Sequence, residues 1–298
     1  MFVVGFGLLA GSGIGFGYAA ATPPAVKWFP PAKTGMIAGI VVSGFGLASV
    51  YAAPLAKYLI KVKDLQFMML FFGVAFLVVV AILAQLLVNP PPKEGAAATS
   101  ASDSDFSVGE MLKTPQFYMV WLMYAFNAGA GLMVIGKLAK LASTQAAYEA
   151  GFIFVALLAI GNAGGRLLAG SLSDKMGRMK VLLIFTTFQT LLMFSTPFMS
   201  NWMILIVFSM CIGMNYGSNL ALFPSITKDY FGLKNFGVNY GFVFTAWGAG
   251  SLLALVAGIV YDRTKSFKIS FFIAGALLIV TLILSFIVKK PEKAGAAS

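Results

Sequence analysis

Long apolar runs alternate with short polar segments along most of the chain. Each run is about 20 residues long, enough for a helix to cross a hydrocarbon core of about 30 Å at about 1.5 Å per residue. The pattern therefore predicts an all-α polytopic membrane protein. The nine predicted spans cover residues 2–22, 34–56, 65–88, 116–136, 149–170, 181–199, 202–223, 237–260 and 269–288.

One polar segment is much longer than the others. Residues 89–110 read NPPPKEGAAATSASDSDFSVGE, a Pro-, Ala- and Ser-rich composition typical of a flexible linker. Within it, Ser107 and Glu110 have capping-box spacing, which predicts a short surface helix before the next span. The predicted parts are the last three helices of an N-terminal bundle over 1–88, a cytoplasmic central linker over 89–115, and a C-terminal six-helix bundle with a short tail over 116–298.

Two of the predicted spans share a pattern at a fixed offset of 202 residues. WFPPAKTGMIAGIVVSGFGLAS (28–49) aligns without gaps with YFGLKNFGVNYGFVFTAWGAGS (230–251). The offset contains six spans, an even number, so both copies run through the membrane in the same direction. This predicts parallel six-helix repeats. The identical pairs are Phe29 with Phe231, Gly35 with Gly237, Gly39 with Gly241, Val41 with Val243, Gly46 with Gly248 and Ser49 with Ser251.

Two six-helix repeats require twelve spans, whereas nine are visible. The second repeat begins near residue 116, and the same offset places the start of the first about 85 residues before Met1. We therefore expect three further helices to precede this sequence in a twelve-helix protein. The alternative is a natural nine-helix protein.

Composition supports a membrane protein and indicates its orientation. Hydrophobic residues make up 59% of the chain and charged residues 10%, whereas a soluble domain has about 25% charged residues. The net charge of +11 comes from cations in short loops and does not imply a nucleic-acid partner. The side with the linker and the C-terminus carries twelve Lys and Arg residues and the other side eight, which favours a cytoplasmic C-terminus in a plasma (inner) membrane.

The residue content argues against membrane-embedded catalysis. Histidine is absent, and Cys211 is the single cysteine, so neither an internal disulfide nor a metal-ligand spacing is present in the sequence. We expect no catalytic residue, no metal and no cofactor. The acidic residues nearest the spans all fall at span ends or in loops, namely Asp64, Glu149, Asp174, Asp229 and Asp262.

The segment GSLSDKMGR joins two predicted spans and has the pattern G-x-x-x-D-K-x-G-R. Its glycines permit a tight turn, and its acid and bases can pair with neighbouring helix ends. The pattern predicts a charged latch that holds one conformation of a moving bundle, and the alternative is a solvated turn that only sets orientation. The latch residues are Gly170, Asp174, Lys175, Gly177 and Arg178.

Arg166 lies inside an apolar run, eight residues or about 12 Å along a helix before Asp174. Burying a guanidinium at that depth costs at least a few kcal/mol, so Arg166 is expected to face a cavity and to bind an anion. The alternative is a side chain that snorkels to the surface. With no acid deep in a span, a substrate carboxylate is the natural partner, because guanidinium binds carboxylate in a bidentate fork. Asn162 is a polar neighbour on the same helix face.

Further side chains are expected to line the cavity. They lie on repeat-related helix pairs, whose midpoints surround the central cavity in transporters built from such repeats. For each aromatic residue taken singly, packing or lipid contact is the alternative role. The predicted lining residues are Tyr18, Phe45, Tyr216, Asn219, Phe244 and Trp247.

Four segments together resemble the oxalate/formate antiporter family of the major facilitator superfamily. They are GYAAATPPAVKWFPPAKTGMIAGIVVSGFG, TPQFYMVW, GNAGGRLLAGSLSDKMGR and NLALFPSITKDYFG. The resemblance covers nearly the whole chain and lacks only the family's first three helices. It implies that Arg166 corresponds to the arginine that binds one carboxylate of oxalate, and that Tyr18 and Tyr216 are cavity aromatics. The family's second cation, a lysine, is replaced here by Trp247, which argues against oxalate itself.

The residues and the resemblance predict a secondary transporter of small organic anions. The expected substrate is a monocarboxylate such as formate, lactate or pyruvate, bound by Arg166 and exchanged by alternating access. The expected partners are this carboxylate and the lipid bilayer, with no nucleic acid, and the expected state is a monomer. Alternatives are a proton-coupled monocarboxylate symporter, a passive channel and a truncated fragment that does not transport.

Overall fold

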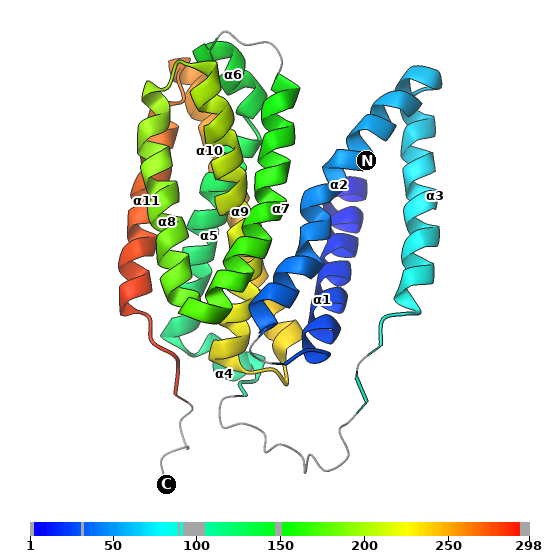
Figure 1. The fold of residues 1–298 in the computed structure, drawn as a ribbon, viewed down its shortest axis with the longest axis vertical. Coiled ribbons are helices and arrows are strands. Elements are labelled where there is room, and N and C mark those ends of the chain that lie inside the picture. The colour runs from blue at the N-terminus through cyan, green and yellow to red at the C-terminus, as the bar shows by residue number, and fades with distance from the viewer. Residues whose placement is uncertain (1–2, 31–32, 89, 92–104, 147–150, 293–298) are drawn as a thin grey trace.

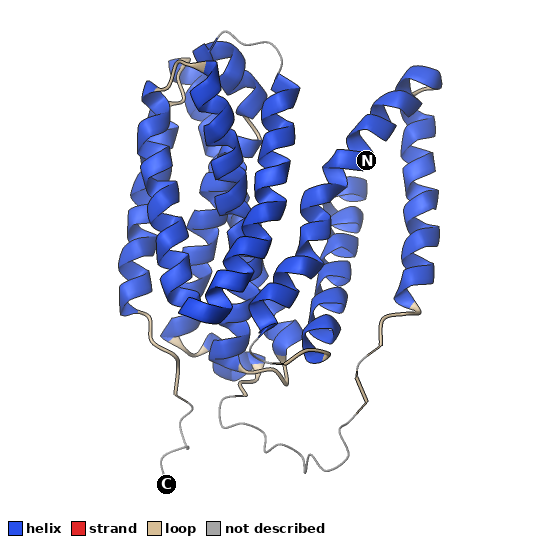
Figure 2. Ribbon diagram, viewed as in Figure 1, coloured by secondary structure: helices blue, strands red, loops and turns tan. Residues whose placement is uncertain are grey.

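The computed structural model describes residues 3–30, 33–88, 90–91, 105–146 and 151–292. Every element in these residues is helical (Figures 1 and 2). In chain order the elements are η1 (Val3–Ala10), α1 (Gly11–Lys27), α2 (Thr34–Val62), α3 (Leu65–Ala84), α4 (Val108–Leu112), α5 (Pro115–Ile135), α6 (Leu138–Ala146), α7 (Gly151–Met176), α8 (Arg178–Ser195), η3 (Thr196–Phe198), α9 (Trp202–Phe231), α10 (Phe236–Thr264) and α11 (Lys268–Ile287).

Each predicted span coincides with a helix or, for residues 2–22, with the continuous run of η1 and α1. Among the described residues, seven helices are long and apolar enough to cross a membrane: α3, α5 and α7 to α11. The predicted all-α polytopic membrane fold is therefore confirmed. The short helix α6, between α5 and α7, was not predicted.

Three predicted helix ends were wrong by six residues or more, and one of them is that of α2, which continues six residues past the predicted end at 56. Helix α7 continues six residues past the predicted end at 170, and α9 continues eight past the predicted end at 223. A proline inside a helix, here Pro224, is tolerated where neighbouring helices and Ser/Thr hydroxyls satisfy the backbone. Pro224 offers no N–H to the Leu220 carbonyl, and nearby the Ser225 and Thr227 hydroxyls donate to the Ala221 and Phe223 carbonyls at 3.0 and 2.7 Å. The polar ends of α7 and α9 are thus parts of helices that pack on other helices.

The predicted capping box is present at the start of α4. The Glu110 carboxylate accepts the Ser107 N–H at 2.7 Å, and the Ser107 hydroxyl accepts the Glu110 N–H at 3.3 Å. The preceding residue, Phe106, is buried and packs edge-on against Phe231, with ring centroids 5.8 Å apart. The end of the linker is therefore anchored to the turn between α9 and α10.

Helices α5 and α7 to α11 form one bundle, and α1 to α3 lie beside it (Figure 1). Helix α2 packs on α7 and α9, and α1 packs on α2 and α10. Helix α3 stands apart, and none of its described side chains is buried. Helices α2 and α7 converge at the end of the molecule that carries α4, which we call the linker side, and diverge towards the other end (Figure 1).

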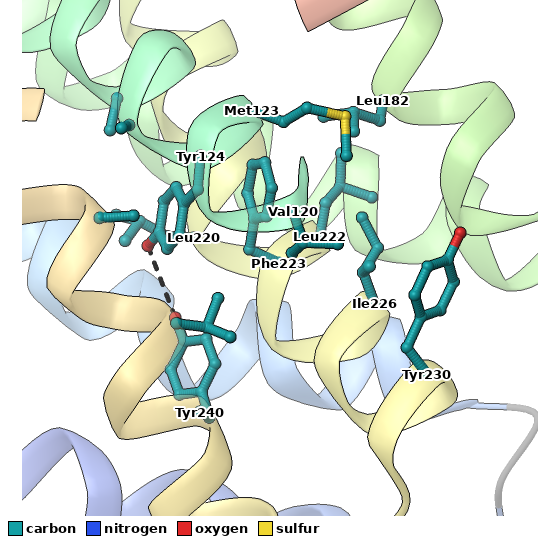
Figure 3. Close-up of a cluster of buried hydrophobic side chains, with 14 of the residues drawn as sticks. Val120, Met123, Tyr124, Leu182, Leu220, Leu222, Phe223, Ile226, Tyr230 and Tyr240 are labelled. Carbon is teal, nitrogen blue, oxygen red and sulfur yellow. Dashed lines mark hydrogen bonds between the residues drawn. The ribbon is translucent and has the colours of Figure 1, made fainter. Parts of the chain in front are cut away.

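The bundle is most tightly packed at the linker side. Residues 215–227 of α9 are all buried, although a helix on the surface of a bundle exposes one face. Figure 3 shows part of this core: the Tyr124 and Phe223 rings stack with centroids 4.2 Å apart, and the Tyr124 and Tyr240 hydroxyls lie 3.5 Å apart. The structure is therefore closed at the linker side.

Helices α2 and α10 have the same length, and both of their ends differ by the predicted offset of 202 residues. Their equivalent glycines have different surroundings. A Cβ on Gly35 or Gly39 of α2 would meet the backbone of α7, whereas a Cβ on Gly237 or Gly241 of α10 would have no described atom within 4 Å. The two helices are thus equivalent in length and position in the repeat, but at these two repeat positions only α2 uses its glycines for packing.

Glycines also bring α7 and α9 together. A Cβ on Gly161 or Gly165 of α7 would overlap the backbone of α9 at Met210 or Met214. On α9, a Cβ on Gly213 or Gly217 would likewise overlap the backbone of α7. Small residues at four-residue spacing let two membrane helices approach to backbone contact. This interface fixes the position and rotation of α7 relative to α9.

We predict that Gly165→Ala destabilises the protein by about 1–3 kcal/mol, because the added methyl group overlaps the α9 backbone. The control is Gly164→Ala at the adjacent, exposed position, where a Cβ would meet nothing within 4 Å. Alanine is the better helix former, so the control is expected to be neutral or slightly stabilising. The measurement is the denaturation temperature in detergent, and equal temperatures for both variants would contradict the predicted contact.

Candidate substrate-binding site

Arg166 is buried at a junction of three helices. Its side chain belongs to α7 and is 2% exposed. Its backbone carbonyl faces Gly39 of α2, and the preceding residue, Gly165, faces α9. A snorkelling side chain would reach the solvent, so the burial of Arg166 contradicts that alternative and agrees with the predicted inward orientation.

Asn162 holds the Arg166 guanidinium from one turn earlier on α7. The Arg166 Nε–H donates to Asn162 Oδ1 at 3.0 Å. Gly217 of α9 makes room for this pair, because a Cβ there would lie 2.8 Å from Asn162 Oδ1 and would overlap the Asn162 carbonyl. The predicted proximity of Asn162 and Arg166 is thus a direct hydrogen bond, and it depends on the α7–α9 interface.

Three aromatic side chains, Tyr216, Trp247 and Phe244, form a second group, which we call the aromatic wall. Trp247 Nε1–H donates to the Tyr216 hydroxyl at 2.8 Å, and the Trp247 ring stacks on Phe244 with centroids 5.7 Å apart and planes 6° apart. Tyr216 is buried against Gly131 of α5, where a Cβ would clash with the ring. Tyr216, Trp247 and Phe244 therefore form one group of contacts, and Tyr216 is the member that lies within electrostatic range of the Arg166–Asn162 pair.

The other predicted lining residues are not placed in this group. Tyr18 and Phe45 lie on α1 and α2, but their side chains are outside the described part of the structure. Asn219 is buried and donates to the Asn215 carbonyl one turn earlier on α9. Asn219 lies about 200° around the helix from Gly217, which faces α7. Among the described contacts, none joins Asn219 to Arg166.

The predicted latch residues connect the two parts of the chain. Asp174 accepts the backbone N–H groups of Gly35 and Met36, each at 2.9 Å. These are first-turn donors of α2, which have no partner within their own helix and which carry the positive end of its dipole. Asp174 therefore caps α2 from the end of α7, and this contact lies at the linker side.

Arg178, at the start of α8, joins the contacts around Asp174. Its Nη1 contacts Asp174 Oδ1 at 2.5 Å and Ser173 Oγ at 2.6 Å, while its Nε donates to Asp229 of α9 at 3.2 Å. The interpretation of the segment as a turn was wrong for Asp174 and Lys175, which lie in the last turn of α7. The reversal occurs at Gly177, whose φ of 90° is readily adopted by glycine. Lys175 is exposed and forms no described contact with α2.

Sequence reasoning missed a further link between α9 and α2. The Lys228 ammonium donates to the Thr34 hydroxyl at 2.8 Å and lies 3.9 Å from Asp229. The pair Lys228–Asp229 follows an apolar run directly, so its position at the end of a span was visible. Its partner on α2 was not, because nothing local in the sequence indicates a residue 194 positions away.

A buried polar group inside the C-terminal bundle was also missed. The Thr186 hydroxyl donates to Asn127 Oδ1 at 3.1 Å, and Gln189 donates to the Asn127 carbonyl at 3.4 Å. All three side chains are about 1% exposed. The amide side chains within apolar runs could have indicated this group, since buried polar side chains in membrane helices pair across helices. This group joins α5 to α8.

Comparisons with known proteins agree with this architecture. The family model of the Major Facilitator Superfamily matches residues 1–144 and 132–298. The uncharacterized MFS-type transporter YhjX of Escherichia coli is 28% identical over 249 residues, which cover 83% of this chain and 62% of YhjX. The oxalate:formate antiporter of Oxalobacter formigenes is 28% identical over 282 residues, 94% of this chain and 66% of that protein. The chain thus spans slightly less than two thirds of the length of both relatives.

The crystal structure of the fucose:proton symporter of E. coli has the same fold. It superimposes with a TM-score of 0.70 over 92% of this chain and 73% of the symporter, at 16% sequence identity. The family and the fold are those of membrane transporters, and the apolar helices agree with a multi-pass membrane protein. On the match of the family model to the whole chain, this protein belongs to the major facilitator superfamily.

Proposed function

We propose that the protein is a secondary transporter of small monocarboxylates in which Arg166 binds the carboxylate. The observation that carries this proposal is a guanidinium that is 2% exposed, held by a neutral amide and within electrostatic range of Tyr216 of the aromatic wall. Such a charge is costly inside a membrane protein unless an anion accompanies it. A carboxylate suits this position because it can accept two parallel N–H bonds from one guanidinium.

The charges of the described helices support an external anion. The acidic residues of α7, α9 and α10 lie in their last turns, at Asp174, Asp229 and Asp262, and Asp64 caps the start of α3. None of the described helices carries an acid at the depth of Arg166. The relative named oxalate:formate antiporter gives independent support for an organic anion as substrate.

The aromatic wall favours a substrate with one negative charge. Where the antiporter family carries a second cation, this chain has Trp247, whose N–H donates to Tyr216. The described site therefore contains one positive charge, that of Arg166. One positive charge balances a monocarboxylate such as formate, lactate or pyruvate, and would leave a dianion such as oxalate half-compensated.

Charge balance also favours exchange over one-way transport. An empty carrier must move the Arg166 charge through a closed state without a counter-ion, and an uncompensated buried charge is costly. A loaded carrier has this charge neutralised by the substrate. Alternating access then requires the linker side to open, and the Asp174–Arg178 contacts with α2 would hold it closed.

Replacement of Arg166 tests the binding role. We expect Arg166→Gln to lose formate binding by at least about tenfold, because a hydrogen bond to a charged group contributes about 1.5–3 kcal/mol. Arg166→Lys keeps the charge but loses the fork, so its affinity should be intermediate. The matched control is Arg263→Gln, which makes the same change at an exposed arginine.

Two measurements compare these variants with the wild type. The first is the rise in denaturation temperature that formate produces in detergent, because a ligand that binds only the folded state stabilises it. The second is counterflow of labelled formate, lactate and oxalate in liposomes. Unchanged formate affinity in Arg166→Gln would overturn the binding role. A wild-type chain that binds formate but shows no saturable counterflow would refute transport by this chain.

Loss of the Asp174 charge tests the latch. We expect Asp174→Asn to favour opening between α2 and α7 by about ten- to hundredfold, since it weakens charged hydrogen bonds to Gly35, Met36 and Arg178. The readout is the thiol-labelling rate of Ser173→Cys in a Cys211→Ser background, because Ser173 is buried beside α2. Asp64→Asn, which alters the cap of α3 alone, is the control. Equal labelling rates in all backgrounds would contradict the latch.

A further inference from the structure

Arg166 of α7 and Arg178, the first residue of α8, each have an Asn or Asp of α7 four residues earlier. Asn162 precedes Arg166, and Asp174 precedes Arg178. In both pairs the side-chain oxygen of the earlier residue accepts a hydrogen bond from the guanidinium, at 3.0 Å and 2.5 Å. The two pairs share the four-residue spacing, but the donor is Nε in Arg166 and Nη1 in Arg178, and the acceptor is neutral in the first pair and charged in the second.

The charged pair lies at the linker side, where Arg178 has a structural role. Its guanidinium is compensated by Asp174 and by Asp229. The neutral pair lies deeper, where the Arg166 side chain is 2% exposed. An amide can orient a guanidinium as a carboxylate does, because its oxygen accepts the same N–H. Unlike a carboxylate, the amide carries no negative charge of its own.

The hydrogen bond also selects one edge of the guanidinium. A carboxylate can bind an arginine either through Nε and one Nη or through the two Nη atoms. The Arg166 Nε–H already donates to Asn162. A carboxylate that arrives while this bond persists is therefore directed to the Nη1–Nη2 edge.

Contacts with α9 restrict how Asn162 can move. The Asn162 backbone lies against Gly213 and Gly217, so closely that a Cβ on Gly217 would overlap its carbonyl. The amide oxygen lies at the same place, 2.8 Å from the position of that Cβ. The acceptor for Arg166 is thus held by a backbone-to-backbone interface between two helices.

We propose that Asn162 is the positioning residue of the anion site: it fixes the Arg166 guanidinium through Nε while preserving its charge. This inference rests on the proposed function and deepens it. The neutrality of residue 162 then determines whether the site accepts an anion. A carboxylate in its place would occupy Arg166 permanently and compete with the substrate.

The isosteric variant Asn162→Asp tests this inference. It keeps the shape and the acceptor oxygen but adds a negative charge about 3 Å from Arg166 Nε. We expect the affinity for formate to fall by at least about hundredfold, while the denaturation temperature without ligand stays the same or rises, since an ion pair forms within the protein. A merely structural role of Asn162 would leave formate binding close to that of the wild type.

Two further variants complete the test. Asn162→Ala removes the acceptor without adding charge, and we expect about tenfold weaker formate binding together with a lower denaturation temperature. Asn215→Asp is the matched control: Asn215 is a buried asparagine of α9 whose amide donates to the Cys211 carbonyl at 2.9 Å, and no described contact joins it to Arg166. Its formate response should be close to that of the wild type.

The outcomes separate this inference from the proposed function. If Arg166→Gln abolishes the formate response and Asn162→Asp retains it, the role of Asn162 is overturned and the carboxylate site stands. If the wild type shows no formate response, or if Arg166→Gln retains it, the proposed function fails and the inference fails with it. Loss of formate binding in Asn162→Asp with unchanged or raised stability supports both.

Discussion

The backbone-to-backbone packing of α7 against α9 and α2 is the constraint on which the rest of this structure depends. Glycines on all three helices allow this approach, and a methyl group at most of these positions would overlap a neighbouring backbone. The same contacts place Arg166 at the junction and hold the Asn162 amide that orients it. The site is thus built by helix packing, which holds the Arg166 side chain in the interior.

The middle and the last turn of α7 have different roles in the proposed transport. Its middle presents a buried arginine beside a neutral amide and within electrostatic range of Tyr216 of the aromatic wall, an arrangement suited to one small anion. Its last turn presents Asp174 to the first turn of α2, which closes the linker side. Because both features belong to one rigid helix, a motion of α7 relative to α2 that opens the linker side also changes the surroundings of Arg166. This coupling is what alternating access requires.

Much of this was predictable from the sequence, for physical reasons. Lipid imposes long apolar runs, so the positions of the spans were visible, and the offset between α2 and α10 reproduced the bounds of both helices. Arg166 stood out because charge is rare at such depth. The rotation of each helix about its axis and the contacts between residues far apart in the sequence were not predictable. The depth of Asn219 in its span did not show that it faces away from α7. Nor did local pattern show that Asp174 would cap a helix more than 130 residues away.

The central claim, that Arg166 binds the carboxylate, is tested most directly by magnetic resonance. The chain contains three arginines, Arg166, Arg178 and Arg263, so labelling them with nitrogen-15 gives few guanidinium signals to assign. With carbon-13 formate bound, dipolar coupling should place the formate carbon within about 4 Å of the Arg166 Nη atoms, the separation of a bidentate pair. Coupling to Arg178 or Arg263 instead, or no coupling to Arg166 at saturating formate, would contradict the account.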